Sequence, residues 1–112
     1  MPDTPLSALM GPGSHHEGDL TFEGRVRVDG HFTGRLYSED ILEIGATGTV
    51  DGEADVARCV LAGRFVGRLR VRERLRIEST GSVEGSLDVG ILELHAGARL
   101  AGDVRVAGKE LP

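Results

Sequence analysis

The chain has 112 residues, a formal net charge of −5, 17 glycines and an aromatic content of only 4%. This length suits one domain with a thin core, and it excludes a separate substrate domain or a deep active-site cleft. The negative charge disfavours nucleic-acid binding, and neither a secretory signal nor an apolar run of roughly 20 residues is present, so we expect a cytoplasmic protein.

A short pattern of apolar, any, glycine, any and apolar residue occurs six times along the chain. The copies lie at residues 16–20, 32–36, 50–54, 65–69, 83–87 and 100–104. Their glycines are 15 to 18 residues apart, which is the spacing of a structural repeat. Two copies depart from the pattern, because His16 replaces the apolar residue in the first and Ala54 is small in the third.

A pair of apolar residues, separated by one residue, lies between successive copies. The pairs are Val26/Val28, Leu42/Ile44, Cys59/Leu61, Leu75/Ile77 and Leu92/Leu94. Alternation with a period of two is typical of strands with one buried face, and no stretch shows the 3.6-residue period of a helix. Turn-forming residues such as Asp29-Gly30 and Ala62-Gly63 separate the strands. The sequence therefore predicts an all-β protein without helices.

Short strands that repeat every 15 to 18 residues predict a β-solenoid. In such a fold three strands form one triangular rung, and the rungs stack about 4.8 Å apart. We expect a single-domain solenoid of about six rungs over residues 9–107, with short tails at residues 1–8 and 108–112. Stacking would bury a continuous core of Val, Leu and Ile, which agrees with the low aromatic content.

If the six glycines stack, the residues that follow them form columns. The residue directly after each glycine gives the column Asp19, Arg35, Glu53, Arg68, Ser86 and Asp103. The residue two further along gives Thr21, Tyr37, Asp55, Arg70, Asp88 and Arg105. Opposite charges on neighbouring strands favour one register by roughly 0.2–1 kcal/mol per pair, so the columns support this alignment.

Two long stretches carry a resemblance to a known family. Residues 13–36, GSHHEGDLTFEGRVRVDGHFTGRL, and residues 60–85, VLAGRFVGRLRVRERLRIESTGSVEG, resemble the bactofilins, and the resemblance covers roughly residues 8–107. Bactofilins are bacterial cytoskeletal proteins, so the resemblance implies a right-handed parallel β-helix that polymerises end to end without nucleotide. It also implies a homopolymer that scaffolds cell-shape or envelope machinery. Relatives often carry an N-terminal membrane-binding stretch, and here Leu6, Leu9 and Met10 offer at most weak peripheral membrane contact.

Both ends of the predicted solenoid expose strand edges and the flank of the core, and the sequence offers little to cap them. We therefore predict a polymer interface at each end. The C-terminal one comprises Leu92, Leu94, Leu100, Val104 and Val106, and the N-terminal one comprises Leu9, Met10, His16, Leu20 and Phe22. The resemblance implies contacts between like ends, whereas the residues alone do not choose between these and a head-to-tail contact.

An arginine-rich run lies in the fourth repeat. Its members are Arg64, Arg68, Arg70, Arg72, Arg74 and Arg76. They form either a docking surface for an acidic partner or a solvated face whose arginines pair with acids on neighbouring rungs, and the second interpretation is favoured. The first would suit an alternative function, that of a non-polymerising β-solenoid adaptor.

Candidates for chemistry are few. His15, His16 and Glu17 are adjacent, but neighbouring strand residues point to opposite faces, so we expect no metal site. Cys59 is interpreted as a small core residue at an inward position. No constellation of serine, cysteine or paired carboxylates is present, so we expect neither enzyme activity nor a cofactor. The glycine spacing disfavours a hexapeptide acyltransferase, and the scattered threonines disfavour an ice-binding solenoid.

Overall fold

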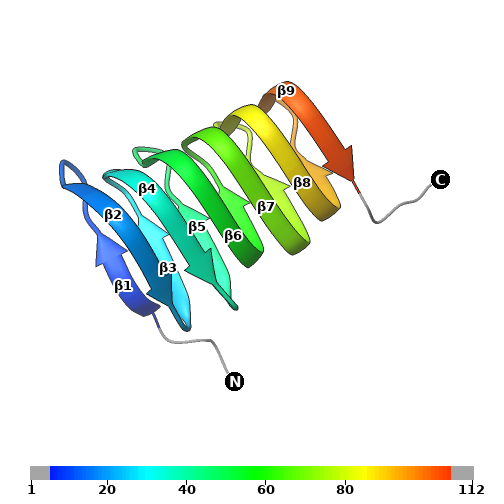
Figure 1. Cartoon of the computed structure of the whole chain (residues 1–112). Coiled ribbons are helices and arrows are strands. Elements are labelled where there is room, and N and C mark those ends of the chain that lie inside the picture. Colours follow the sequence, from blue (N-terminus) through cyan, green and yellow to red (C-terminus); the bar gives the residue numbers. More distant parts are fainter. Residues whose placement is uncertain (1–5, 107–112) are drawn as a thin grey trace.

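The computed structural model describes residues 6–106, whose strands pair in parallel and wind into a coil (Figure 1). The strands are β1 (Leu6–Met10), β2 (His15–Phe22), β3 (Arg25–Val28), β4 (His31–Ser38), β5 (Ile41–Ile44), β6 (Thr49–Leu61), β7 (Arg64–Ile77), β8 (Ser82–Leu94) and β9 (Arg99–Val106). The described residues contain no helix, and hence none that could cross a membrane. The predicted all-β solenoid is confirmed.

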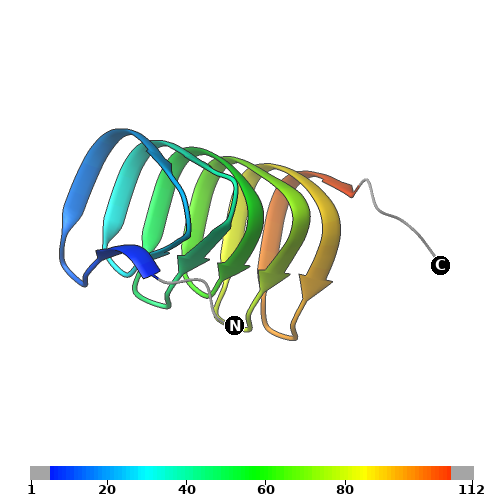
Figure 2. The ribbon, with the colours of Figure 1, turned by 90° about the horizontal axis from the view of Figure 1, so that it is seen from below.

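The turns of the coil lie side by side along the rod axis, with β1 and β9 at opposite ends of the rod (Figures 1 and 2). Each complete turn joins a segment with a central glycine to a shorter segment, as β2 joins β3 and as β6 does within one strand. Five turns are complete, and β1 and β9 add an unfinished turn at either end. This corrects the expected six rungs, because β9 has no following short segment among the described residues.

The six glycines of the repeat lie in one column, as predicted. Each pairs with the next in successive parallel strands, in the order Gly18, Gly34, Gly52, Gly67, Gly85 and Gly102. The same register brings together the two predicted columns of polar residues, for example Arg35, Glu53 and Arg68. The alignment read from the sequence is therefore confirmed.

The unequal glycine spacing arises at two places in each turn. The corner after the glycine-bearing segment has two residues in some turns, such as Glu39-Asp40, and one in others, such as Ala57. The loop that closes the turn has two residues, such as Ala62-Gly63, or four, such as 78–81. Together with the glycine itself, these breaks divide each turn into three segments, which agrees with the predicted three-sided rung.

Inward side chains stack into apolar columns that run through the rod. Two columns from the glycine-bearing segments are Phe32, Val50, Phe65, Val83 and Leu36, Ala54, Leu69, Leu87. Two columns from the short segments are Val26, Leu42, Cys59, Leu75 and Val28, Ile44, Leu61, Ile77. All of these side chains are buried, so the rod has one continuous core in the predicted register.

The strand structure begins at Leu6, ahead of the boundary at residue 9 that the sequence predicts. β1 pairs with β3, with Ala8 opposite Val26 and Met10 opposite Val28. The described structure ends at Val106. Residues 1–5 and 107–112, which hold most of the two predicted tails, lie outside the described part of the chain.

Candidate functional site

Both ends of the coil leave strand edges unpaired. At the N-terminal end β1 pairs only with β3 and β2 only with β4, and at the C-terminal end β9 pairs only with β8. No other element in the described part of the chain covers these edges (Figure 1). Exposed N–H and C=O groups on such an edge can pair with a strand of another molecule.

The C-terminal end presents the last members of the inward columns. The five residues predicted for this interface all lie there: Leu92, Leu94, Leu100, Val104 and Val106. Leu94, Val104 and Val106 are exposed by 51%, 40% and 45%, which is high for inward positions. Leu92 and Leu100 are half-buried and pack against the core. An exposed apolar surface of this kind is typical of a site that another molecule covers.

The N-terminal end is less apolar. His16 is exposed and stands in register with the buried Phe32, while Leu20 and Phe22 are half-buried and pack against the core. The backbone of Leu9 is in register with Arg27. The side chains of Leu6, Leu9 and Met10 lie outside the described part of the chain, so their predicted interface and membrane roles stay predictions.

A comparison with known families agrees with this architecture. A family model described as "Bactofilin: Polymer-forming cytoskeletal" matches residues 8–105. The chain belongs to the bactofilin family. The searches of curated proteins and of solved structures gave no significant match. The resemblance seen in the two long stretches of sequence is therefore confirmed over nearly the whole described rod.

The arginine-rich run of this bactofilin does not form one surface. Arg64 precedes the glycine of its turn, Arg68 and Arg70 follow it, and Arg74 and Arg76 lie on the short segment beyond the corner. Because the chain changes direction at the glycine and at the corner, these residues face three different sides of the rod. The six arginines therefore surround one turn rather than form a single stripe, and the adaptor alternative, binding of an acidic partner through this turn, stays a prediction.

Most of these arginines contact acidic residues nearby. Arg64 donates to Glu84 at 2.7 Å on the next turn, Arg74 lies 3.6 Å from Glu93, and Arg76 also contacts Glu93, at 3.5 Å. The favoured interpretation, pairing between neighbouring turns, therefore holds for these residues. Arg68 and Arg70 are different, because neither makes a hydrogen bond or ion pair within the described residues, although their predicted acidic neighbours are in register.

Arg72 has a role that the sequence does not reveal. The corner of its own turn has two residues, whereas the corner of the turn before has only the buried Ala57. The Arg72 side chain crosses this short corner and reaches the turn beyond it. Its Nη2 donates to the carbonyl oxygen of Ser38 at 2.5 Å, and its Nη1 donates to the Tyr37 hydroxyl at 3.4 Å.

Further contacts hold the Arg72 guanidinium in place. It lies over the Tyr37 ring at 5.4 Å from the centroid, and its nitrogens lie 3.7 Å from Asp55 and 4.0 Å from Glu39. The hydrogen bond to Tyr37 raises the pKa of Arg72 above its ordinary value. Arg72 therefore ties the second turn to the fourth across the short third corner. The glycine spacing does not reveal this role, because the shortest spacing reflects both the one-residue corner and the two-residue loop of the third turn.

We predict that Arg72→Ala lowers the free energy of unfolding by about 1–2 kcal/mol, because the Ser38 carbonyl loses its charged donor. Urea denaturation followed by circular dichroism measures this change. Arg70→Ala is the matched control on the same strand, and it should shift stability by no more than about 0.5 kcal/mol. Equal effects from the two substitutions would contradict the role assigned to Arg72.

The remaining candidates for chemistry lie as follows. The rings of His15 and His31 stack with centroids 4.7 Å apart, and the described residues contain no group of three potential metal ligands. Cys59 is buried, as predicted, and burial raises the pKa of its thiol to about 12, with the Glu43 carboxylate adding to the shift. The thiol therefore stays protonated near neutral pH, as a core residue should.

Proposed function

We propose that this bactofilin polymerises end to end into filaments that need no nucleotide and that serve as a scaffold for cell-shape or envelope machinery. The observation that carries the proposal is the pair of open ends, where unpaired strand edges coincide with the ends of the apolar columns. The family description, polymer-forming and cytoskeletal, supports a structural role rather than an enzymatic one. We place the filament in the cytoplasm, with at most weak membrane contact through Leu6, Leu9 and Met10.

The two ends differ in a way that favours the C-terminal end as the stronger contact. Its column ends are leucine and valine, whereas one column at the N-terminal end finishes in His16. Two copies that meet at the same end are related by a two-fold axis, so their facing strands run antiparallel. Antiparallel edges form a full ladder of hydrogen bonds, and such a contact buries both apolar ends at once.

A charge on the inward side of the last strand tests this proposal. Val104→Lys places an ammonium group among the exposed column ends, a device that natural proteins use to keep sheet edges apart. We expect the wild-type protein without nucleotide to form long thin filaments in negative-stain electron microscopy, and Val104→Lys to form none or only pairs joined through the other end.

The matched control is Ala101→Lys, which adds the same charge to the same strand at an outward position beside Glu84. It should polymerise like the wild type, and circular dichroism should show β structure in both variants. A wild-type protein that stays monomeric across salt and concentration would overturn the proposal. Filaments that persist in a folded Val104→Lys variant would overturn the assignment of the C-terminal end.

A further inference from the structure

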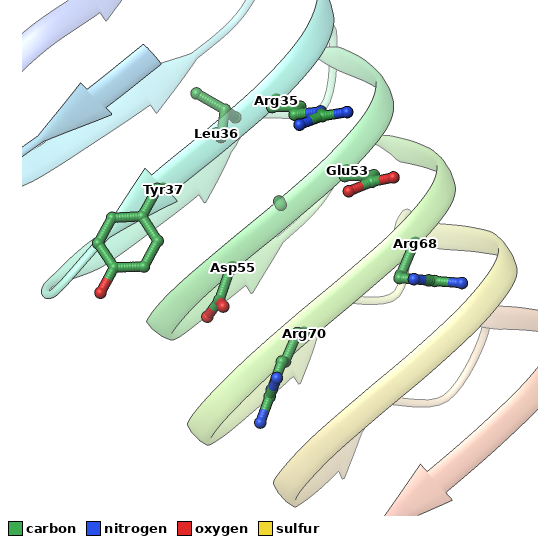
Figure 3. Close-up of a pocket in the computed structure, with 8 residues that line it drawn as sticks. Arg35, Leu36, Tyr37, Glu53, Asp55, Arg68 and Arg70 are labelled. Carbon is green, nitrogen blue, oxygen red and sulfur yellow. The ribbon is translucent and has the colours of Figure 1, made fainter. Parts of the chain in front are cut away.

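A shallow groove runs along one side of the rod, on the segments that follow the repeat glycines. One wall is the row Arg35, Glu53 and Arg68, and the other is the row Tyr37, Asp55 and Arg70 (Figure 3). The hollow between them has a volume of about 310 Å³. A second hollow of about 320 Å³ shares Arg68 and Arg70 and extends the groove toward the C-terminal end.

The charges along this groove alternate and are largely unused by the chain itself. Within the described residues, Arg35, Glu53, Arg68 and Arg70 make no hydrogen bond or ion pair, and Asp55 has only the contact with Arg72 at 3.7 Å. All four of the first group are exposed. In Figure 3 the side chains of each row project from the ribbon in a similar direction, one from each successive turn. These four side chains are therefore free to meet charges on another molecule, whereas Asp55 is half-buried, with its Oδ1 buried near Arg72.

The spacing of the charges identifies the partner. Neighbouring members of a row sit on neighbouring turns, about 4.8 Å apart, because that is the distance between paired strands. An extended peptide repeats its side chains on one face at about 6.6 Å, so its charges fall out of step after one or two matches. Another solenoid has the same spacing between its turns, and a second copy of this chain carries the matching charges.

We propose that this side of the rod binds the same side of a second copy in antiparallel orientation. The two copies are then related by a two-fold axis that crosses the rods at right angles, midway between the third and fourth turns. In this arrangement each Glu53 faces an Arg68 of the other copy, and each Asp55 faces an Arg70. In a parallel two-fold arrangement the rows are exchanged instead, so Arg68 meets Arg70 and Glu53 meets Asp55. In the antiparallel pair the four opposite pairs outnumber two like-charge contacts between Asp19 and Asp103. In the parallel pair the four like-charge contacts outnumber two opposite ones between Asp103 and Arg105, so the charges favour the antiparallel pair.

This lateral contact goes beyond the end-to-end polymer and does not depend on it. Ion pairs on a surface are individually weak and are screened by salt, so two single rods associate only weakly. In a filament every copy carries this surface, and many weak contacts can then act together. Filaments should therefore gather into bundles at low ionic strength and separate as salt is added.

Charge reversal with cross-rescue tests the proposal. Glu53→Arg and Arg68→Glu filaments are formed separately, and bundling is measured by low-speed pelleting and by filament width in negative stain. At about 0.01 M salt each variant alone should pellet at least about tenfold less than the wild type, because positions 53 and 68 then carry the same charge where they face each other.

Mixing the two preformed filaments should restore the bundles. In an antiparallel pair of one variant with the other, the two substituted positions face each other with opposite charges. The unchanged Arg68 of the Glu53→Arg variant likewise faces the unchanged Glu53 of the Arg68→Glu variant. Recovery in the mixture therefore separates a specific contact from a general loss of solubility or folding, since each variant alone carries like charges at these positions.

Filament length reports the end contact and filament width reports the lateral contact, so the two proposals fail separately. If the rods do not polymerise, sedimentation velocity of the same variants and their mixture measures the lateral pair directly. Both positions are exposed, and circular dichroism checks that the variants are folded. Wild-type bundling that is unchanged at about 1 M salt, variants that bundle like the wild type, or a mixture that does not recover would each overturn the proposal.

Discussion

Gly67→Ala is expected to unfold much of the rod, lowering the free energy of unfolding by more than about 4 kcal/mol. Gly67 has a φ of 126°, a conformation that side chains rarely adopt, and it lies in the middle of the glycine column. A Cβ atom there would overlap the carbonyl oxygen of Gly52 on the preceding turn. Because that neighbour is backbone, paired on both sides, it cannot move aside without breaking the stack. Urea denaturation followed by circular dichroism measures the loss.

Gly18→Ala separates the two causes of this effect. Gly18 has nearly the same conformation, with a φ of 123°, but it lies in the first glycine-bearing strand and a Cβ atom there meets nothing within 4 Å. Gly18→Ala should therefore lower the free energy of unfolding only by the backbone strain, about 1–3 kcal/mol. If the two alanine variants lost the same stability, close approach of successive turns would not be the reason for the glycine column.

Phe65→Ala is expected to lower the free energy of unfolding by about 3–5 kcal/mol. Phe65 is fully buried in the fourth turn, between Val50 and Val83 of the same column. The strands above and below are held at a fixed distance by their hydrogen bonds, so they cannot close on the cavity that the ring leaves. The size of the effect can be read from thermal or urea unfolding at low protein concentration.

Phe22→Ala removes the same side chain from a half-buried site near the N-terminal end. This substitution should lower the free energy of unfolding by less than Phe65→Ala does, because it removes less buried apolar surface. A larger loss at Phe22 than at Phe65 would mean that stability is concentrated at the end of the rod rather than in its middle.

Much of the fold could be predicted because equivalent residues of successive turns stack on one another in a solenoid. The glycines at 18, 34, 52, 67, 85 and 102 share a backbone conformation and lie in one column, so aligning them aligns everything else. The inward pairs such as Leu42/Ile44 then follow from alternation. The five residues predicted for the C-terminal interface lie at that end for the same reason, since they are the last members of the inward columns.

The differences between prediction and structure arise from features that repeat counting does not show. Counting glycines predicts six rungs, but β9 is not followed by a short segment in the described structure, so five turns are complete. The arginines from Arg64 to Arg76 lie close together in sequence, yet the glycine and the corner turn them to different sides.

The amino-acid sequence alone is enough to find the repeat, the strand content, the stacking register and the family, because each depends on residues close together in the chain. The contacts between side chains of different turns depend on the folded coil. The bond from Arg72 to Ser38 joins residues two turns apart, and it requires the corner at Ala57 to be one residue shorter than its neighbours. The unpaired charges of Glu53 and Arg68 are a second case, because stacking places them side by side without making them partners. Such relations are set by distances across the coil, and no local pattern of residues carries them.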